Sequence, residues 1–191
     1  MRSFILGCIV LLGYCLVLPV CAQDFSNKGK DFWVGYGSHC DMYNTNGTIN
    51  TTTGGPQQMV LYFATDSITN ITVSIPGLGF TQTYSNIPAN SIFETPTLPK
   101  TGATDARLGS EGTSSKGIHI VSDQPIVAYA HIYNGSRSGA TLLFPTNTLG
   151  KEYYSLNMTQ NGGQAWSYCY FFVVATDRKS TRLNSSHANI S

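Results

Sequence analysis

Apolar and polar residues alternate in short runs along most of the chain, and Gly, Pro, Asn and Ser separate the runs. In the run NITVSI, for example, Ile71, Val73 and Ile75 fall on one face of an extended strand and the polar residues fall on the other. Runs of this kind predict strands, here at residues 31–36, 58–65, 70–75, 80–85, 91–96, 117–122, 125–133, 140–145, 153–158 and 167–176. We therefore predict an all-β domain, an antiparallel sandwich or barrel-like fold of about ten short strands.

The run at residues 125–133 is apolar on both faces, which predicts a central strand. One face carries Val127, Tyr129, His131 and Tyr133. Only two residues separate this run from residues 117–122, so we expect the two runs to pair with each other. Because Pro125 lacks the N–H that a tight hairpin needs, the connection between them should be loose.

The two ends of the chain do not share this pattern. Residues 1–22 combine Arg2, a long apolar run and small residues before Gln23, which is the layout of a secretory signal peptide. An uncleaved membrane anchor is the alternative. Residues 178–191 form a polar, basic string that is either a disordered tail or, as we favour, a non-native read-through sequence. We expect residues 23–177 to form one incomplete domain that is secreted or held at the outer cell surface, with no stable membrane span after signal removal.

The net charge of residues 23–177 argues against nucleic acid as a partner. The whole chain has a formal net charge of +1, with 11 Lys and Arg against 10 Asp and Glu. Four of the basic residues lie in the two ends, so residues 23–177 carry seven basic and ten acidic side chains, a net charge of −3. A nucleic-acid-binding protein presents a basic face, so nucleic acid is not expected as a partner.

The stretch YGSHCDMY places His39, Cys40 and Asp41 side by side, and these residue types build thiol nucleophiles and metal sites. After signal removal, however, only Cys40 and Cys169 remain, and in an oxidising compartment they are candidates for one disulfide. Adjacent residues of a strand also point to opposite faces, which would place His39 poorly to act on Cys40. We therefore favour a disulfide or an inert thiol over metal ligation or catalysis, and predict no catalytic residue, metal or cofactor.

Binding is the remaining class of activity. The loops at residues 40–58, 96–117 and 134–139 are polar, and long loops in a compact domain are often functional. Aromatic side chains with polar neighbours are typical of sugar sites, although core packing is the favoured alternative for both Trp33 and Trp166. The candidate ligand surface consists of Tyr43, Arg107, Asn134, Arg137 and Trp166.

Three blocks of the chain resemble the N-terminal domain of IgGFc-binding proteins, a domain that also begins large secreted bacterial surface proteins. The first two are KGKDFWVGY and VSIPGLGFTQTYSNIPANS, and the third consists of KGIHIVSDQPIVAYAHIY followed by LLFPTNTLGKEYYSLNM. The resemblance runs from about Lys28 to Thr176, and GKDFW is closer to the bacterial members. It implies a non-enzymatic extracellular module that binds a protein or glycan, at the start of a longer protein. A carbohydrate-binding module of an exported enzyme is the alternative. The family brings no catalytic motif and no residue that we can assign to an Fc contact.

Overall fold

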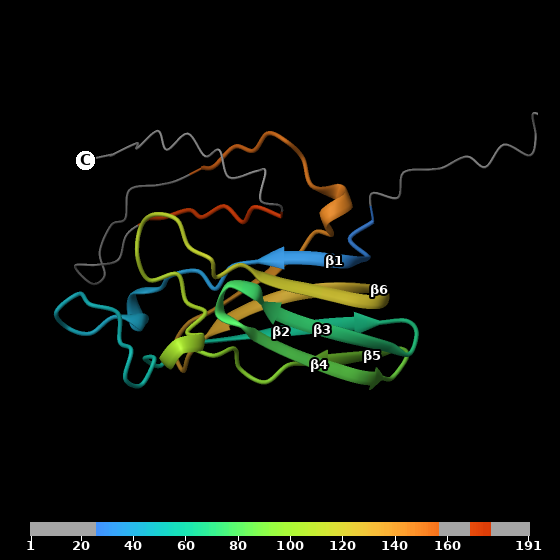
Figure 1. Cartoon of the computed structure of the whole chain (residues 1–191), viewed down its shortest axis with the longest axis horizontal. Helices are drawn as coiled ribbons and strands as arrows, with labels where there is room; N and C mark the ends of the chain where they lie inside the picture. Colours follow the sequence, from blue (N-terminus) through green and yellow to red (C-terminus); the bar gives the residue numbers. More distant parts are fainter. Residues whose placement is uncertain (1–25, 157–168, 177–191) are drawn as a thin grey trace, which may run out of the picture.

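The computed structural model describes residues 26–156 and 169–176 and is all-β over these residues (Figure 1), as predicted. Its strands are antiparallel and form one sheet that curls into a half-barrel. They are β1 (Gly29–Val34), β2 (Gln58–Thr65), β3 (Thr69–Ile75), β4 (Phe80–Ile87), β5 (Ser91–Glu94), β6 (Ile118–Tyr133) and β7 (Ser138–Leu142). Short 3-10 turns lie between them: η1 (Cys40–Met42), η2 (Pro76–Leu78), η3 (Gly102–Thr104) and η4 (Thr146–Thr148).

Strand β6 is the centre of the sheet. Its first half pairs with β1 and β3, and its second half pairs with β2 and β7. The prediction of a central strand at residues 125–133 is confirmed, but the expected pairing of this run with residues 117–122 is wrong, because the two runs form one continuous strand. Residues 123–125 have no ladder partner among the described residues, so Pro125 sits where β6 changes partners and needs no N–H.

The other predicted strands agree with the structure except near the end of the chain. The described parts of the runs at 153–158 and 167–176 carry no strand. The last described segment instead packs beside β1, where the ring of Phe172 lies so close to Gly35 that a Cβ there would be 2.6 Å from it. No helix in the described ranges has the length and hydropathy needed to cross a membrane.

The inner face of the curled sheet holds the core. Alternate residues of β2, β3 and β6 point inward, as the sequence pattern predicts. Fully buried members of this core include Phe32, Leu61, Phe63, Ile71, Ile120 and Ile126. Burying a side chain of this kind contributes about 1.5–3 kcal/mol, so the inner face dominates the stability of the sheet.

Asp123 lies at the corner of β6 where the strand changes its pairing partners, and its carboxylate holds this corner against β3. Its Oδ1 accepts hydrogen bonds from Thr69 Oγ1 (2.5 Å) and from the Asn70 amide N–H (2.9 Å), and its Oδ2 accepts one from Asn70 Nδ2 (2.7 Å). The bond from Thr69 and those from Asn70 stabilise the carboxylate and lower the pKa of Asp123 to about 2. The corner of β6 is thus tied to the start of β3 by a charged group.

This corner should weaken in acid. Asp123 is bonded as a carboxylate only in the folded chain, so its stabilising contribution is complete above pH ~4 and is lost as the pH falls toward about 2. An NMR titration of the side-chain carboxyl carbons measures this pKa directly. In the Asp123→Asn variant, the free energy of unfolding should fall less between pH ~4 and about 2 than in the unmodified chain, because this carboxylate is absent. A pKa near the ordinary value of ~3.9 would contradict the prediction.

Candidate functional site

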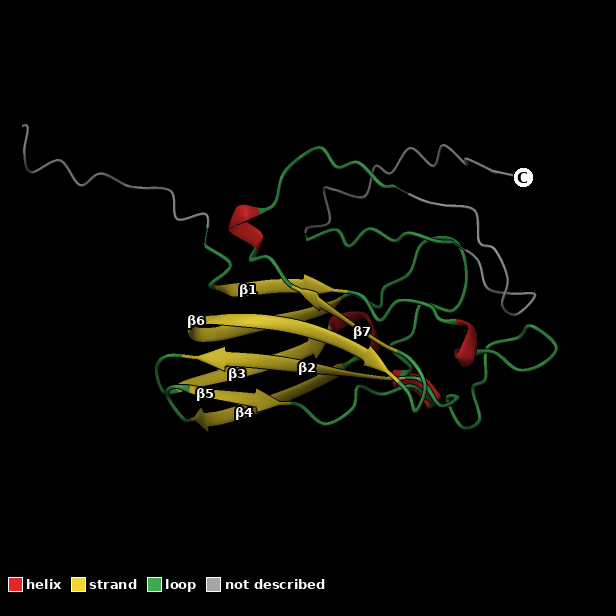
Figure 2. Ribbon diagram, turned by 180° about the vertical axis from the view of Figure 1, so that it is seen from behind, coloured by secondary structure: helices red, strands yellow, loops and turns green. Residues whose placement is uncertain are grey.

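The candidate site lies at the end of the sheet where β6 ends and β2 begins (Figure 2). Three connections meet there: residues 35–57 with η1, residues 95–117 with η3, and the β6–β7 turn at residues 134–137. We call this region the loop end of the sheet. Each connection was predicted as a polar loop, but their contacts with one another follow only from the fold.

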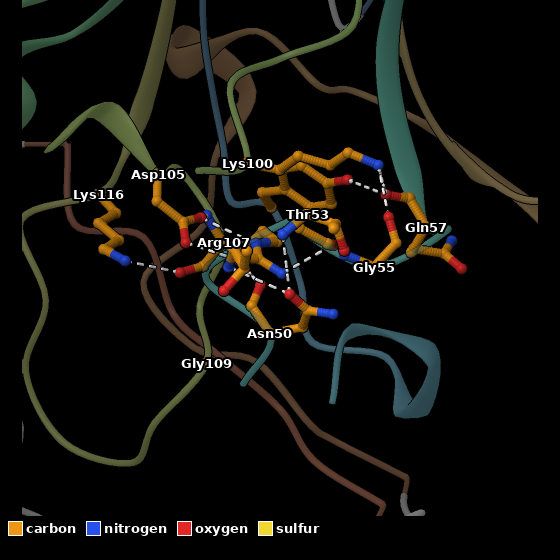
Figure 3. Close-up of polar contacts among 12 residues, drawn as sticks. Asn50, Thr53, Gly55, Gln57, Lys100, Asp105, Arg107, Gly109 and Lys116 are labelled. Atoms are coloured by element: carbon orange, nitrogen blue, oxygen red, sulfur yellow. Dashed lines mark hydrogen bonds and ion pairs between the residues drawn. The ribbon is translucent and has the colours of Figure 1, made fainter. Parts of the chain in front are cut away.

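Arg107 joins two of these connections from the inside (Figure 3). Its side chain is 0% exposed. Nε and Nη2 donate to the two carboxylate oxygens of Asp105 (2.9 and 2.6 Å). Nη1 donates to the Gly54 carbonyl and Nη2 to the Asn50 carbonyl, each at 2.8 Å. The prediction that Arg107 belongs to the ligand surface is therefore wrong, because its guanidinium is used up inside the protein.

Burial and the charge of Arg107 shift the pKa values of two neighbouring groups, Asp105 and Lys100. Burial alone would raise the pKa of Asp105, but the hydrogen bonds from Arg107 outweigh it and hold the pKa below its ordinary value. Burial, together with the charge of Arg107, lowers the pKa of Lys100. The Lys100 ammonium and the buried Tyr36 hydroxyl both donate to the Gln57 carbonyl at 3.1 Å. This network fixes the backbone of residues 50–57 in place.

Gln57 connects the buried network to a second cluster at the surface. Asn134 Nδ2 donates to Gln57 Oε1 (3.0 Å) and to Asp41 Oδ2 (2.5 Å). Arg137 Nη1 donates to the same carboxylate oxygen at 2.7 Å. We call Asp41, Asn134 and Arg137 the polar rim. The structure thus brings together two residues of the predicted ligand surface and adds Asp41, which was not predicted as part of it.

The pKa of Asp41 reflects these contacts. Burial would raise it, but the hydrogen bonds from Arg137 and Asn134 outweigh the burial and lower it. The carboxylate is therefore charged throughout the neutral range. Its partner Arg137 keeps a side chain that is 55% exposed, so this guanidinium can also meet a ligand.

Next to the polar rim, η1 changes the geometry assumed for the HCD stretch. Residues 39–41 are not in a strand: His39 caps the 3-10 turn, and its Nδ1 accepts a hydrogen bond from the Asp41 amide at 3.1 Å. The Cys40 Sγ lies 3.8 Å from His39 Nδ1 and 3.8 Å from Asp41 Oδ1. The prediction that His39 and Cys40 point to opposite faces is therefore wrong, because these residues are not in a strand. Among the described residues, these three form the group whose ligand atoms could hold a metal ion.

The remaining predicted residues have different positions. The structure contains no disulfide between Cys40 and Cys169; the Cys40 thiol faces its own turn and Cys169 lies in the exposed last segment. The Tyr43 hydroxyl contacts Ser38 Oγ (2.8 Å) and donates to the Gly109 carbonyl (3.3 Å), which ties η1 to residues 95–117. Trp166 lies outside the described residues.

An aromatic surface that was not predicted as a site lies on the outer face of the sheet. It consists of Tyr62, Tyr129, His131 and Tyr133, which we call the aromatic face. Tyr62 and Tyr129 are register partners on β2 and β6, and Tyr129 is 38% exposed. The His131 ring stacks on Tyr133 with centroids 4.9 Å apart, and the centroid of the Tyr62 ring lies 5.9 Å from that of His131.

The aromatic face and the polar rim are neighbours in the chain at two points, because Asn134 follows Tyr133 at the end of β6 and Arg137 precedes Ser138 at the start of β7. His131 Nε2 lies 2.7 Å from Ser138 Oγ on β7, and this hydrogen bond fixes the ring. The signal in the sequence was the alternation at residues 127–133. It placed three of the four side chains on one face, but it could not show that this face is the outer one.

Trp33 occupies another part of the outer face. Its ring stacks on His119 at 4.2 Å, and His119 Nε2 lies 2.8 Å from Asp31 Oδ2. Trp33 is half-buried, so the favoured expectation that it packs in the core is wrong. It sits on β1 against the first half of β6.

No family model, curated protein or solved structure matches the chain. Function must therefore be argued from the side chains of the site. The arrangement offers flat rings for stacking and, beside them, a charged group that is held in a fixed position. It is suited to recognition of a ligand that has both apolar faces and polar groups.

Proposed function

We propose that the chain is a secreted or cell-surface binding module without enzymatic activity, which serves as the N-terminal adhesion part of a larger extracellular protein. The resemblance to the IgGFc-binding N-terminal domain implies the same. The observation that carries the proposal is the aromatic face, with the polar rim next to it in the chain. Its ligand would be an extracellular protein or glycan.

Several features support recognition at this surface. Aromatic rings with few rotatable bonds bury a large area at a small cost in conformational entropy. The rings stand on paired strands, and the hydrogen bond from Asn134 to Gln57 holds the rim, so little of the surface has to be ordered on binding. The exposed Arg137 guanidinium supplies donors for carboxylate, amide or hydroxyl groups.

An array of glycans and glycoproteins, including mucin and IgG Fc, tests the proposal with the full chain. We expect saturable binding that the Tyr133→Ala variant weakens about tenfold or more, equivalent to ~1.4 kcal/mol. The matched control is Tyr154→Ala, because Tyr154 is 93% exposed and lies outside the aromatic face. Equal losses in the two variants, or binding that neither variant changes, would contradict the assignment of the surface.

A carbohydrate-binding module of an exported enzyme is the second candidate, favoured by the stacked rings of the aromatic face. Saturable binding to polysaccharides alone would support it, and binding to proteins alone would exclude it. Trp166→Ala belongs in the same array, because Trp166 is a predicted ligand residue outside the described part of the chain. A hydrolase would instead show turnover that depends on His39 or Cys40, and we expect none.

A further inference from the structure

His39, which caps η1, and Cys40 and Asp41 within η1 bring three possible metal ligands close together. Cys40 Sγ is 3.8 Å from His39 Nδ1 and 3.8 Å from Asp41 Oδ1, while His39 Nδ1 is 3.5 Å from Asp41 Oδ2. Zinc binds thiolate sulfur at about 2.3 Å and imidazole or carboxylate at about 2.0–2.2 Å, so the edges of its tetrahedron measure about 3.3–3.5 Å between nitrogen and oxygen ligands and about 3.5–3.7 Å from sulfur to either of them. Cys40 Sγ is therefore close to an edge length from both Nδ1 and Oδ1, and the ligand atoms of the three side chains all lie within 4.8 Å of one another, so a small adjustment of the side chains completes three corners of such a tetrahedron.

We propose that His39, Cys40 and Asp41 form a binding site for a soft divalent cation, with Zn²⁺ as the best fit. Sulfur and nitrogen ligands favour Zn²⁺ over Mg²⁺ or Ca²⁺, which prefer oxygen. The His39 and Asp41 side chains are 27% and 21% exposed, so solvent and a dissolved cation can reach the site. This inference does not rest on the proposed binding function.

The 3-10 turn holds the His39 ring in an orientation suited to metal binding. His39 Nδ1 accepts a hydrogen bond from the Asp41 amide, so in this state the nitrogen carries a lone pair and its proton is on Nε2. This is the tautomer that binds a metal through Nδ1, and the cation would take the place of the amide proton. A strand would have separated these three side chains, whereas the 3-10 turn brings their polar atoms together.

The charges around the site also fit a divalent cation. The Cys40 thiolate and the Asp41 carboxylate together supply two negative charges, which balance the cation. Arg137 and Asn134 both donate to Asp41 Oδ2 and leave Oδ1 directed at the thiol. They would act as outer partners that orient the carboxylate, a role whose loss typically lowers metal affinity about 10–100-fold.

Cobalt spectroscopy tests the site in the full chain. Replacing Cys8, Cys15, Cys21 and Cys169 with Ser leaves Cys40 as the sole thiol. Under reducing conditions, titration with Co²⁺ should produce a thiolate-to-cobalt charge-transfer band of the strength of one sulfur, with the visible bands of four-coordinate cobalt. Added Zn²⁺ should remove these bands by displacing the Co²⁺.

Variants then assign the other ligands. His39→Ala and Asp41→Asn should each lower the affinity for Co²⁺ by more than the ~10–100-fold expected from loss of an outer partner, as in Asn134→Ala. His119→Ala is the matched histidine control and should leave the spectrum unchanged. If Asp41→Asn fails to fold, His39→Gln still decides the matter, because it removes the ring and leaves the contacts of Asp41 with Arg137 and Asn134 intact.

A second readout is stability. Zn²⁺ should raise the Tm of the sole-thiol chain, because it binds only the folded turn, and a further Cys40→Ser replacement should abolish the rise. Two results would overturn the proposal. One is the absence of a charge-transfer band, and the other is a band of full strength in both His39→Ala and Asp41→Asn, which would mean that the thiol alone binds the cation.

Discussion

Replacing Arg107 with Ala is expected to destabilise the chain by about 3–5 kcal/mol, the usual cost of removing one partner of a buried ion pair. The change leaves the mostly buried Asp105 carboxylate without its counter-charge and the carbonyls of Asn50 and Gly54 without their donors. Arg107→Lys should recover only part of this loss, because an ammonium group cannot bond both carboxylate oxygens and two carbonyls from one plane.

Urea denaturation of the full-length variants measures the free energy of unfolding. Arg137→Ala is the matched control, because its side chain is 55% exposed and its ion pair with Asp41 is only partly buried. Its loss should stay within about 1 kcal/mol. If Arg107→Ala costs no more than Arg137→Ala, the guanidinium does not join the two connections in the way that Figure 3 shows.

Gly55→Ala is expected to have the next largest effect. Gly55 has a φ of +69°, and a Cβ there would lie 2.4 Å from the Asp41 carbonyl oxygen. The left-handed backbone alone costs a non-glycine residue about 1–3 kcal/mol, and the contact adds to it because a backbone atom must move. The change should therefore both destabilise the chain and displace η1, which carries the proposed metal ligands.

Gly79→Ala separates the two contributions. Gly79 has a similar φ of +64°, but a Cβ there would meet nothing within 4 Å. The excess loss in Gly55→Ala over Gly79→Ala therefore reports the contact with Asp41. Denaturation gives the stabilities, and amide shifts of residues 39–42 in ¹H–¹⁵N spectra report the turn. Equal losses, with unchanged shifts at these residues, would show that Gly55 does not hold η1 in place.

Strands were predictable wherever the signal is local. Alternation located β2 at its observed bounds and β3 within one residue, because the period of a strand is visible in a single run. Continuity of β6 was not predictable, since it depends on partners far away in the sequence. The DQP sequence at 123–125 looks like a turn, but Asp123 bonds to β3 and no ladder partner is required there.

The site was harder to predict for three physical reasons. Arginine is rarely buried, so Arg107 was assigned to the surface, although Asp105 two residues earlier was a sign of its partner. The HCD stretch was treated as extended, whereas the capping bond to His39 Nδ1 makes it a turn. For the aromatic face, alternation shows which residues share a side but does not distinguish the inner side of the sheet from the outer one.

Because four strands pair with β6, the order in which the strands can pair during synthesis is restricted. Before residues 118–133 have left the ribosome, β1 lacks the strand that it pairs with in the described part of the chain, and β2 and β3 can form only their pairs with β5 and β4. Pairing of β1 with β6 closes a loop of most of the domain, which is entropically slow. The half-barrel should therefore assemble late, in one cooperative step, once β6 is present.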